Sequence, residues 1–148
     1  MLRSWLNVNC YYFSREPQYK GKSKLVAEKM LEYNIMDYKF FCFHGKPMYV
    51  ELYIDRFGNH KKLFYDMDWN IAGFTTANDV VKGSLEKPKE FEEMKDVALK
   101  LCKGMAFVSV DLYLHNGRIY FGEMTFCPAG GYTPITSREW EYKLGGMI

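Results

Sequence analysis

The sequence lacks the features that mark membrane, secreted, zinc-binding and nucleic-acid-binding proteins. Its apolar runs are far shorter than the ~18 residues that a membrane span needs, and Asn7 and Asn9 interrupt the N-terminal segment where a signal peptide would be apolar. Its four cysteines share no C-x-x-C spacing, which favours reduced thiols over zinc ligands or disulfides. Lys and Arg are scattered among Asp and Glu, and the net charge is only +2, so nucleic acid is not an expected partner. We therefore expect a cytoplasmic protein without a membrane span.

The composition is that of one globular domain. A length of 148 residues suits a single domain over residues 1–148, and 48% hydrophobic with 18% aromatic residues supports a packed core. No internal repeat and no linker rich in Gly, Ser or Pro divides the chain. Periodicity and turn signals predict strands over 25–27, 37–43, 48–57, 61–66, 107–114 and 118–126, and helices over 2–13, 88–104 and a short stretch near the C-terminus. The predicted fold class is α+β, a mainly antiparallel sheet with flanking helices.

The last strand pair carries two acidic residues that point to a metal site. Asn-Gly between alternating apolar runs is a strong hairpin signal, and Asp111 and Glu123 lie on its two arms. A three-residue turn over 116–118 would set Asp111 directly opposite Glu123 and would pair Ser109 with Thr125 on the same face. Two carboxylates about 5 Å apart repel each other unless a cation or a shared proton lies between them. The pair therefore predicts a divalent metal.

The length of the turn decides between this interpretation and a simpler one. A tight two-residue turn shifts the register by one residue and sends Asp111 and Glu123 to opposite faces of the sheet. The hairpin would then carry two solvated acids and no metal site.

Longer stretches of the sequence form a recognisable series, from S-W-L, N-C-Y-Y and R-E-P-Q-Y-K through L-V-A-E-K-M-L, D-Y-K-F-F-C-F-H-G-K-P and I-D-R-F-G-N-H-K-K-L-F-Y-D-M-D-W to V-S-V-D-L-Y, G-R-I-Y-F-G-E-M-T-F-C-P-A-G-G and R-E-W-E-Y-K-L-G. In this order they resemble the C-terminal part of the TupA-like ATP-grasp family. ATP-grasp enzymes hold Mg-ATP between two α+β subdomains and form an acyl phosphate, which an amine or a similar nucleophile then attacks. The resemblance therefore implies a ligase that joins a carboxylate to an amine, with ATP and magnesium as cofactors.

The TupA-like branch is associated with the biosynthesis of cell-wall and capsular polysaccharide, including teichuronopeptide, and its members are often labelled glycosyltransferases. The resemblance thus implies a nucleotide and a small-molecule or polysaccharide-precursor substrate as binding partners.

The same resemblance gives the hairpin acids a role. ATP-grasp enzymes bind magnesium through an acid on one strand and through a Glu and an Asn, two residues apart, on the next strand. These positions fall on Asp111, Glu123 and Thr125. Oxygen ligands suit magnesium, which keeps water and substrate phosphates in its other positions. The chain departs from the family at Thr125, where a hydroxyl replaces the amide, and at Ser109, where an R-x-D pattern would supply a phosphate-facing arginine. Both departures argue against catalytic turnover, whereas metal binding is still expected.

A nucleotide-binding hinge is implied by Glu28, Lys29 and Leu31, which resemble the family's E-K-x-L pattern. In that pattern the Glu and the backbone of the following residues hydrogen-bond the adenine edge. Asp37 then resembles the acid that receives the ribose hydroxyls, although it lies further from Glu28 than is usual. The alternative interpretation is that Glu-Lys followed by an apolar residue opens a solvated amphipathic helix.

Basic residues flank the turn between the second and third predicted strands. Arg56, Lys61 and Lys62 would lie near the phosphates, where cations offset the charge that develops on a transferred phosphoryl group. We therefore assign them as the catalytic candidates. A solvated basic turn is the equally weighted alternative, since charge runs on ordinary surfaces are mostly solvated.

Parts of a complete ATP-grasp enzyme have no counterpart in this sequence. The resemblance covers neither an N-terminal substrate domain nor a first subdomain with a phosphate loop, and no G-x-x-x-x-G-K-[ST] pattern compensates for them. We therefore expect a truncated or split member that is incomplete as an enzyme on its own, with a partner chain as one source of the missing half.

Two other classes of function stay open. In the first, D-M-D at Asp66–Asp68 would be the D-x-D of a glycosyltransferase, which holds a metal and a sugar-nucleotide diphosphate. In the second, the chain is a non-catalytic nucleotide-binding or partner module, whose exposed apolar surface would be the face that packs on the missing half.

Overall fold

The computed structural model describes residues 4, 6–9, 11–14, 17–22, 24–33, 35–54, 61–76 and 83–148, with the backbone alone at residues 13, 14, 17, 18, 54 and 61. The chain divides into two compact units, residues 1–31 and 32–148. Among the helices in these described ranges, none has both the length and the apolar character that crossing a membrane requires.

The first unit contains little regular structure. Its described elements are the helix α2, Tyr11–Ser14, and the 3-10 helix η1, Pro17–Lys20. The predicted helix over residues 2–13 is wrong at residues 6–9, which form turn and coil. The side chain of Asn9 accepts a hydrogen bond from Tyr11 N at 3.0 Å. An Asn that bonds in this way caps the N-terminus of a helix, so the helix begins after Asn9. The predicted strand over 25–27 is also wrong, because these residues are coil.

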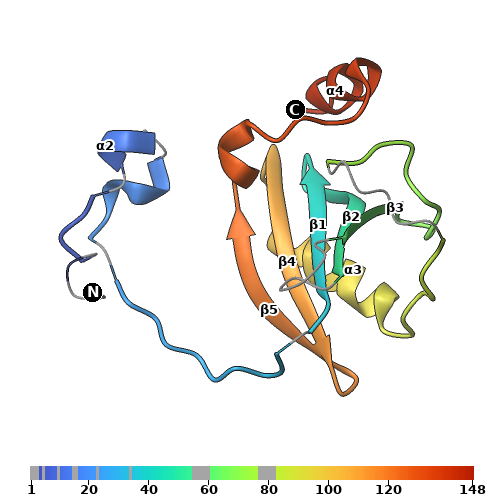
Figure 1. The fold of residues 1–148 in the computed structure, drawn as a ribbon, viewed down its shortest axis with the longest axis horizontal. Helices are drawn as coiled ribbons and strands as arrows, with labels where there is room; N and C mark the ends of the chain where they lie inside the picture. The colour runs from blue at the N-terminus through green and yellow to red at the C-terminus, as the bar shows by residue number, and fades with distance from the viewer. Residues whose placement is uncertain are drawn as a thin grey trace. The chain divides into compact units, whose positions relative to one another are not determined.

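The second unit is built on a five-stranded sheet with the order β3-β2-β1-β4-β5, in which every neighbouring pair is antiparallel. The strands are β1 (Asp37–Phe43), β2 (Lys46–Ile54), β3 (Lys61–Asp66), β4 (Phe107–His115) and β5 (Arg118–Thr125). The helices are α3 (Phe91–Leu101), the 3-10 helix η2 (Pro128–Gly131) and α4 (Arg138–Gly145). Figure 1 shows β1 in the middle of the sheet between β2 and β4. The α+β class and the antiparallel sheet are thus confirmed.

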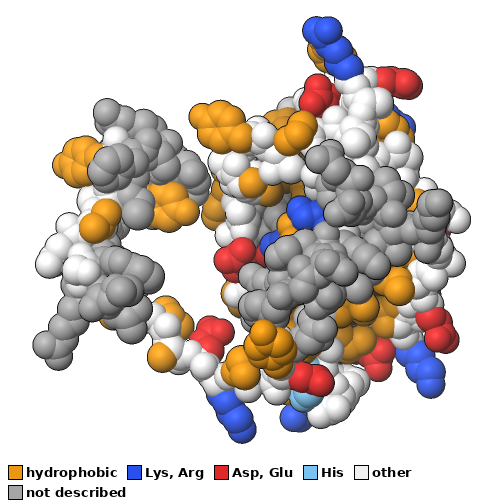
Figure 2. Space-filling model, viewed as in Figure 1, with side chains coloured by type: hydrophobic (Ala, Val, Ile, Leu, Met, Phe, Trp, Pro, Cys, Tyr) orange, Lys and Arg blue, Asp and Glu red, His pale blue; other side chains and the backbone are white. Residues whose placement is uncertain are grey.

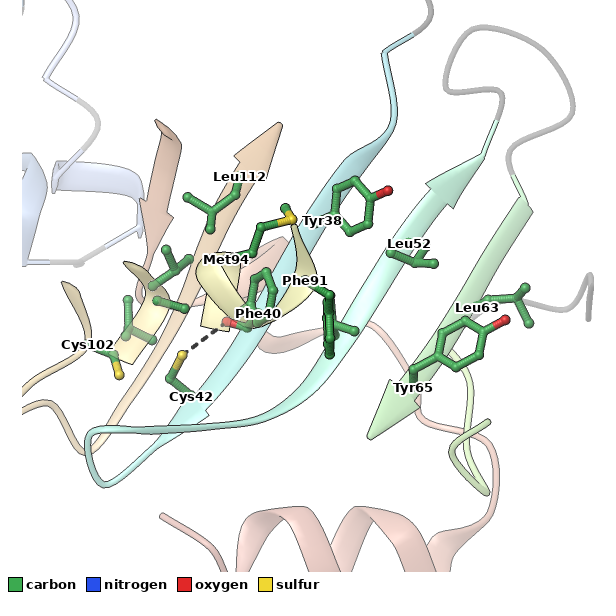
Figure 3. Packing of buried hydrophobic residues seen from close by; sticks show 14 residues of the cluster. Tyr38, Phe40, Cys42, Leu52, Leu63, Tyr65, Phe91, Met94, Cys102 and Leu112 are labelled. Atoms are coloured by element: carbon green, nitrogen blue, oxygen red, sulfur yellow. Dashed lines mark hydrogen bonds between the residues drawn. The ribbon is translucent and has the colours of Figure 1, made fainter. Parts of the chain in front are cut away.

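One face of the sheet forms the main core with α3. Helix α3 begins after Pro88, carries Glu92 and Glu93 in its first turn, and is followed by Gly104 at φ 78°, as its sequence signals predict. Its apolar stripe packs on alternate residues of the strands, as Figure 3 shows. The buried members are Tyr38, Phe40, Cys42, Val50, Leu52, Leu63, Tyr65, Phe91, Met94, Ala98, Cys102, Val108, Val110 and Leu112. The thiols of Cys42 and Cys102 are free, in agreement with the prediction of reduced cysteines.

The other face of the sheet is divided into an apolar end and a charged end. At the apolar end, Phe43 and Phe64 belong to a second cluster, which includes Leu144 of α4. Further along β1 on the same face lie Lys39 and Asp37, because side chains alternate along a strand. Helix α4 therefore covers one end of this face and leaves the charged end to form a site.

The β4–β5 hairpin has the predicted pairing of Ser109 with Thr125, but its turn differs from the predicted one. Its turn has two residues, Asn116 (φ 51°) and Gly117 (φ 70°), so the predicted three-residue turn is wrong. A turn with two left-handed residues has a backbone twist that matches the twist of the two flanking strands. Asn-Gly is favoured in such a turn, because both residues adopt the left-handed conformation readily. A β-bulge then restores the register, since Val110 pairs with Met124 while Leu112 pairs with Phe121.

This bulge places Gly122 and Glu123 together opposite Asp111. As a result Ser109 pairs with Thr125, the pairing expected from the longer turn. Glycine is required at the bulge, because a Cβ on Gly122 would lie 2.8 Å from Cε2 of Tyr113 and 3.0 Å from the backbone oxygen of Asp111. A one-residue shift caused by the turn is therefore cancelled by the one-residue bulge.

The chain reverses direction after β3 around the carboxylate of Asp66. Its Oδ1 accepts hydrogen bonds from the backbone N–H groups of Asp68 at 2.9 Å and Asn70 at 2.8 Å. These bonds and the Asn70 side chain lower the pKa of Asp66, although burial alone would raise it. The returning segment bonds to β3, with Asp66 N donating to Asn70 O at 2.9 Å and Ala72 N donating to Phe64 O at 2.8 Å. The first Asp of the D-M-D motif thus has a structural role.

Candidate functional site

A row of charged side chains crosses the charged end of the sheet, with one member on each strand. From β3 to β5 the charged row consists of Lys62, Glu51, Lys39, Asp111 and Glu123. Register places Glu51 and Asp111 directly opposite Lys39, one on either side. The exposed fraction is 3% for Glu51 and 1% for Asp111, so these carboxylates are buried among side chains of opposite charge. Figure 2 shows basic and acidic side chains next to one another over the sheet.

Lys39 is the centre of the charged row. Its Nζ contacts Asp111 Oδ2 and lies 3.9 Å from Asp37 Oδ2 and 4.0 Å from Glu123 Oε1. Burial alone would lower the pKa of Lys39, but the hydrogen bond to Asp111 and the charges of Asp111 and Asp37 raise it overall. The ammonium group is therefore charged at neutral pH, and it is the cation that lies among these carboxylates.

Asp111 and Glu123 lie on the same face of the sheet, with Thr125 adjacent. Ser109 Oγ donates a hydrogen bond to Asp111 Oδ1 at 2.8 Å, and Thr125 Oγ1 donates to Glu123 Oε1 at 3.2 Å. Burial raises the pKa of Asp111, and the hydrogen bonds from Lys39 and Ser109 oppose this shift. The structure thus brings the predicted metal residues together.

The chemistry of these donors fits magnesium. In the described part of the chain, no group of three or more His, Cys, Asp or Glu side chains has the arrangement of a metal site. Magnesium needs fewer protein ligands, because it binds through one or two carboxylates together with phosphate oxygens and water. Asp111 and Glu123 would provide those carboxylates, so their role as metal ligands stays a prediction.

A second ion pair joins β2 and β3. Lys62 Nζ lies 3.1 Å from Glu51 Oε1, which also accepts a hydrogen bond from Thr76 Oγ1 at 3.1 Å. Burial raises the pKa of Glu51 in spite of both partners. Burial alone would lower the pKa of Lys62, but hydrogen bonds with Tyr53 and Glu51 raise it overall. Of the basic residues predicted near the phosphates, Lys62 is in the row, whereas Arg56 and the side chain of Lys61 lie outside the described residues.

Four members of the charged row, Lys62, Glu51, Lys39 and Glu123, line a pocket of about 190 Å³, whereas the buried Asp111 is not a lining residue but contacts Lys39. Residues of η2 and its flanking segment form another part of the wall, and Ala129, Gly130 and Gly131 have φ angles of 49°, 65° and 77°. The lining residues are Lys39, Phe41, Glu51, Tyr53, Lys62, Thr76, Ser109, Glu123, Thr125, Pro128, Ala129 and Thr133. The lining includes two ammonium groups, which can donate to the oxygens of a phosphate chain, and two carboxylates, Glu51 and Glu123, whose charge a metal ion bound with the phosphates would offset.

The residues predicted for the nucleotide hinge belong to the first unit. Glu28, Lys29 and Leu31 have coil backbone and exposed side chains. The alternative that they open a helix is wrong, because residues 24–32 contain no helix. Their contact with adenine stays a prediction. Asp37 belongs to the second unit, where it is 2% exposed and lies beside Lys39, and its contact with ribose also stays a prediction.

Sequence reasoning missed Lys39 and Glu51. A signal for both was present in the alternation of the strands, since Lys39 follows Asp37 by two residues and Glu51 lies between the apolar Val50 and Leu52. Each therefore had to lie on the face opposite the core.

Comparison with known proteins found one match, to a family model. The family model described as TupA-like ATPgrasp matches residues 1–148, the full length of the chain. No curated protein and no solved structure matches the chain. The family match covers both units, including the residues of the charged row. The chain therefore belongs to the TupA-like ATP-grasp family.

Proposed function

We propose that the chain binds the phosphates of Mg-ATP over the charged row, as part of a ligase that joins a carboxylate to an amine. The observation that carries this proposal is the pocket lined by Lys39, Lys62 and Glu123, with Asp111 on the same face of the sheet in contact with Lys39. Ammonium groups and a carboxylate-bound magnesium ion are the groups that stabilise a transferred phosphoryl group. Family membership supplies the independent support for ATP.

Three members of the charged row and the neighbouring Thr125 have a role in this proposal. Asp111 and Glu123 hold magnesium, which would neutralise phosphate oxygens when it is bound. Lys62 donates to a phosphate oxygen from the opposite end of the row. Thr125 fixes the Glu123 carboxylate through its hydrogen bond. We expect Ser109 to slow turnover relative to the R-x-D pattern of ATP-grasp enzymes, because a hydroxyl supplies no charge to the phosphates.

The acceptor belongs to the biosynthesis of cell-surface polysaccharide, including teichuronopeptide. Support for this part comes from the TupA-like branch as a whole. The reaction would activate a carboxylate of a polysaccharide or peptide precursor as an acyl phosphate, and an amine would displace the phosphate.

Isothermal titration with Mg-ATP and with Mg-UDP-sugars tests the proposal. Mg-ATP should bind and UDP-sugars should not. Lys62→Met should weaken ATP binding about tenfold or more, because a charge-assisted hydrogen bond contributes about 1.5–3 kcal/mol. Lys103→Met is the matched control, since Lys103 is exposed and is not a lining residue of the pocket. Equal ATP affinities of the two variants would contradict the proposal.

The same titration separates the alternatives. Selective binding of a UDP-sugar would favour a glycosyltransferase, although Asp66 of the D-M-D motif is already hydrogen-bonded within its turn. Binding of ATP without any ATP hydrolysis or ligation, even when a partner chain with the missing half is added, would favour a non-catalytic nucleotide-binding module.

A further inference from the structure

We propose that the ammonium group of Lys39 compensates the charges of Asp111 and Glu123 in the absence of ligand, and that it moves to the phosphates when a polyphosphate binds. We call Lys39 in this role the tethered cation, because its charge is attached to the chain. Metal and nucleotide would then bind in a linked manner, and the metal alone would bind poorly. This inference rests on the proposed function, because it assigns a regulatory residue to the same site.

The hydrogen bonds of Asp111 carry the first step. Its Oδ1 accepts a bond from Ser109 and its Oδ2 contacts the ammonium group of Lys39, so both oxygens of this 1% exposed carboxylate already have donors. Each oxygen keeps a second lone pair, so the obstacle to a metal ion is the ammonium charge beside Oδ2. An ammonium group and a magnesium ion repel each other, so the two cations compete for Asp111.

The same ammonium group also lies within reach of the other acids. Its distances of 3.9 Å to Asp37 and 4.0 Å to Glu123 place it among all the carboxylates at this end of the row. A single cation thus offsets charges that would otherwise repel each other. Its removal without a replacement would leave buried carboxylates uncompensated, which is strongly unfavourable.

The pocket offers Lys39 a second partner when an anion enters. Lys39 is itself a lining residue, and the ring centroid of Tyr53, another lining residue, lies 5.5 Å from its Nζ. A phosphate group in the pocket could accept the ammonium group after a change of side-chain rotamer. Asp111 would then be open to the magnesium ion that accompanies the phosphates. Linkage is reciprocal, so the metal would strengthen nucleotide binding by the same factor.

Manganese binding without nucleotide tests this directly. Free Mn²⁺ is measured by its EPR signal during titration of the unmodified chain, of Lys39→Met and of Lys39→Arg. Lys39→Met should bind Mn²⁺ about tenfold more tightly or better than the unmodified chain, a factor within the usual range of coupling between sites. Lys39→Arg keeps the charge and should show no gain. Equal Mn²⁺ affinity of the unmodified chain and Lys39→Met would overturn the proposal.

Two further measurements keep the test decisive. Lys39→Gln retains a neutral donor for Asp111, and it should show the same gain if Lys39→Met does not fold. In thermal unfolding, MgCl₂ alone should raise the Tm of the neutral variants and leave that of the unmodified chain unchanged, and the opposite pattern would overturn the proposal. In either neutral variant, adding Asp111→Asn should abolish the gain.

These outcomes also separate this inference from the proposed function. A gain of Mn²⁺ affinity in a chain that does not bind Mg-ATP would refute the proposed function but support the competition between Lys39 and the metal for Asp111. Binding of Mg-ATP without such a gain would refute the tethered cation alone.

Discussion

Replacing Gly122 by alanine should destabilise the protein, because the bulge beside Asp111 has no room for a side chain. The added Cβ would lie 2.8 Å from Cε2 of Tyr113 and 3.0 Å from the backbone oxygen of Asp111. The tyrosine ring can rotate away, but the backbone oxygen is held in the sheet. The clash can therefore be relieved only if the bulge shifts, and Glu123 shifts with the bulge.

The cost follows from this geometry. Steric overpacking of a well-packed site typically costs about 1–3 kcal/mol. Each kcal/mol lowers the Tm of a domain of this size by roughly 2–4 °C. We therefore expect Gly122→Ala to lower the free energy of unfolding by about 1–3 kcal/mol. A shift of Glu123 should also lengthen its distance to Lys39.

Gly145→Ala is the matched control. A Cβ on Gly145 meets nothing within 4 Å, its φ is not in the left-handed region, and it lies at the end of α4. The same chemical change should leave stability unaltered there or increase it by about 0.4–1 kcal/mol through the unfolded state. Urea denaturation followed by tryptophan fluorescence measures both variants. If Gly122→Ala were as stable as Gly145→Ala, the assignment of a glycine-dependent bulge would be refuted.

Three other predictions concern single acidic residues. Asp66→Ala should cost about 1–2 kcal/mol in urea denaturation because backbone donors of the turn lose their acceptor, whereas Asp68→Ala should cost little, and equal losses would contradict this role. Glu51 has a raised pKa in the folded protein, so a protonated Glu51 stabilises the fold. The free energy of unfolding should therefore fall as the pH rises from 4.5, the ordinary pKa of Glu51, through the raised pKa, by at most about 1.4 kcal/mol per pH unit. Glu51→Gln should show a smaller fall, because only the raised pKa of Asp111 then contributes to it, and the same pH profile in both chains would rule out the assignment. If Glu28 accepts the adenine amino group, ATP should bind better than GTP by roughly 1–3 kcal/mol and Glu28→Gln should reduce the difference, whereas equal affinities in the unmodified chain would favour a solvated Glu28.

Local patterns predicted the strands of the second unit and the side of the sheet that becomes the core. Alternation along 37–43 places Phe40 and Cys42 on one face, and the structure buries both completely. The hairpin shows the limit of such reasoning. Asn116-Gly117 favoured a two-residue turn, which alone would have separated Asp111 from Glu123. The compensating signal was Gly122, since a glycine inside a strand pattern often marks a bulge.

The charged row could not be derived from one hairpin, because its central residue comes from elsewhere in the chain. Lys39 reaches Asp111 only when β1 pairs with β4, two strands separated by 72 positions at this contact. Such pairing depends on the packing of α3 and on the order of strands, which local periodicity does not encode. The sequence therefore indicated that a cation is needed between the two acids but did not show that a lysine provides it.

The turn after β3 has a consequence for how the protein meets other copies of itself. A strand at the edge of a sheet exposes unpaired backbone groups, which can recruit a strand from another molecule and start aggregation. Here residues 70–72 fold back along β3, and Phe64 O and Asp66 N are already bonded to Ala72 and Asn70. The chain thereby closes part of one sheet edge with its own backbone. Intermolecular strand addition at β3 is blocked at these positions.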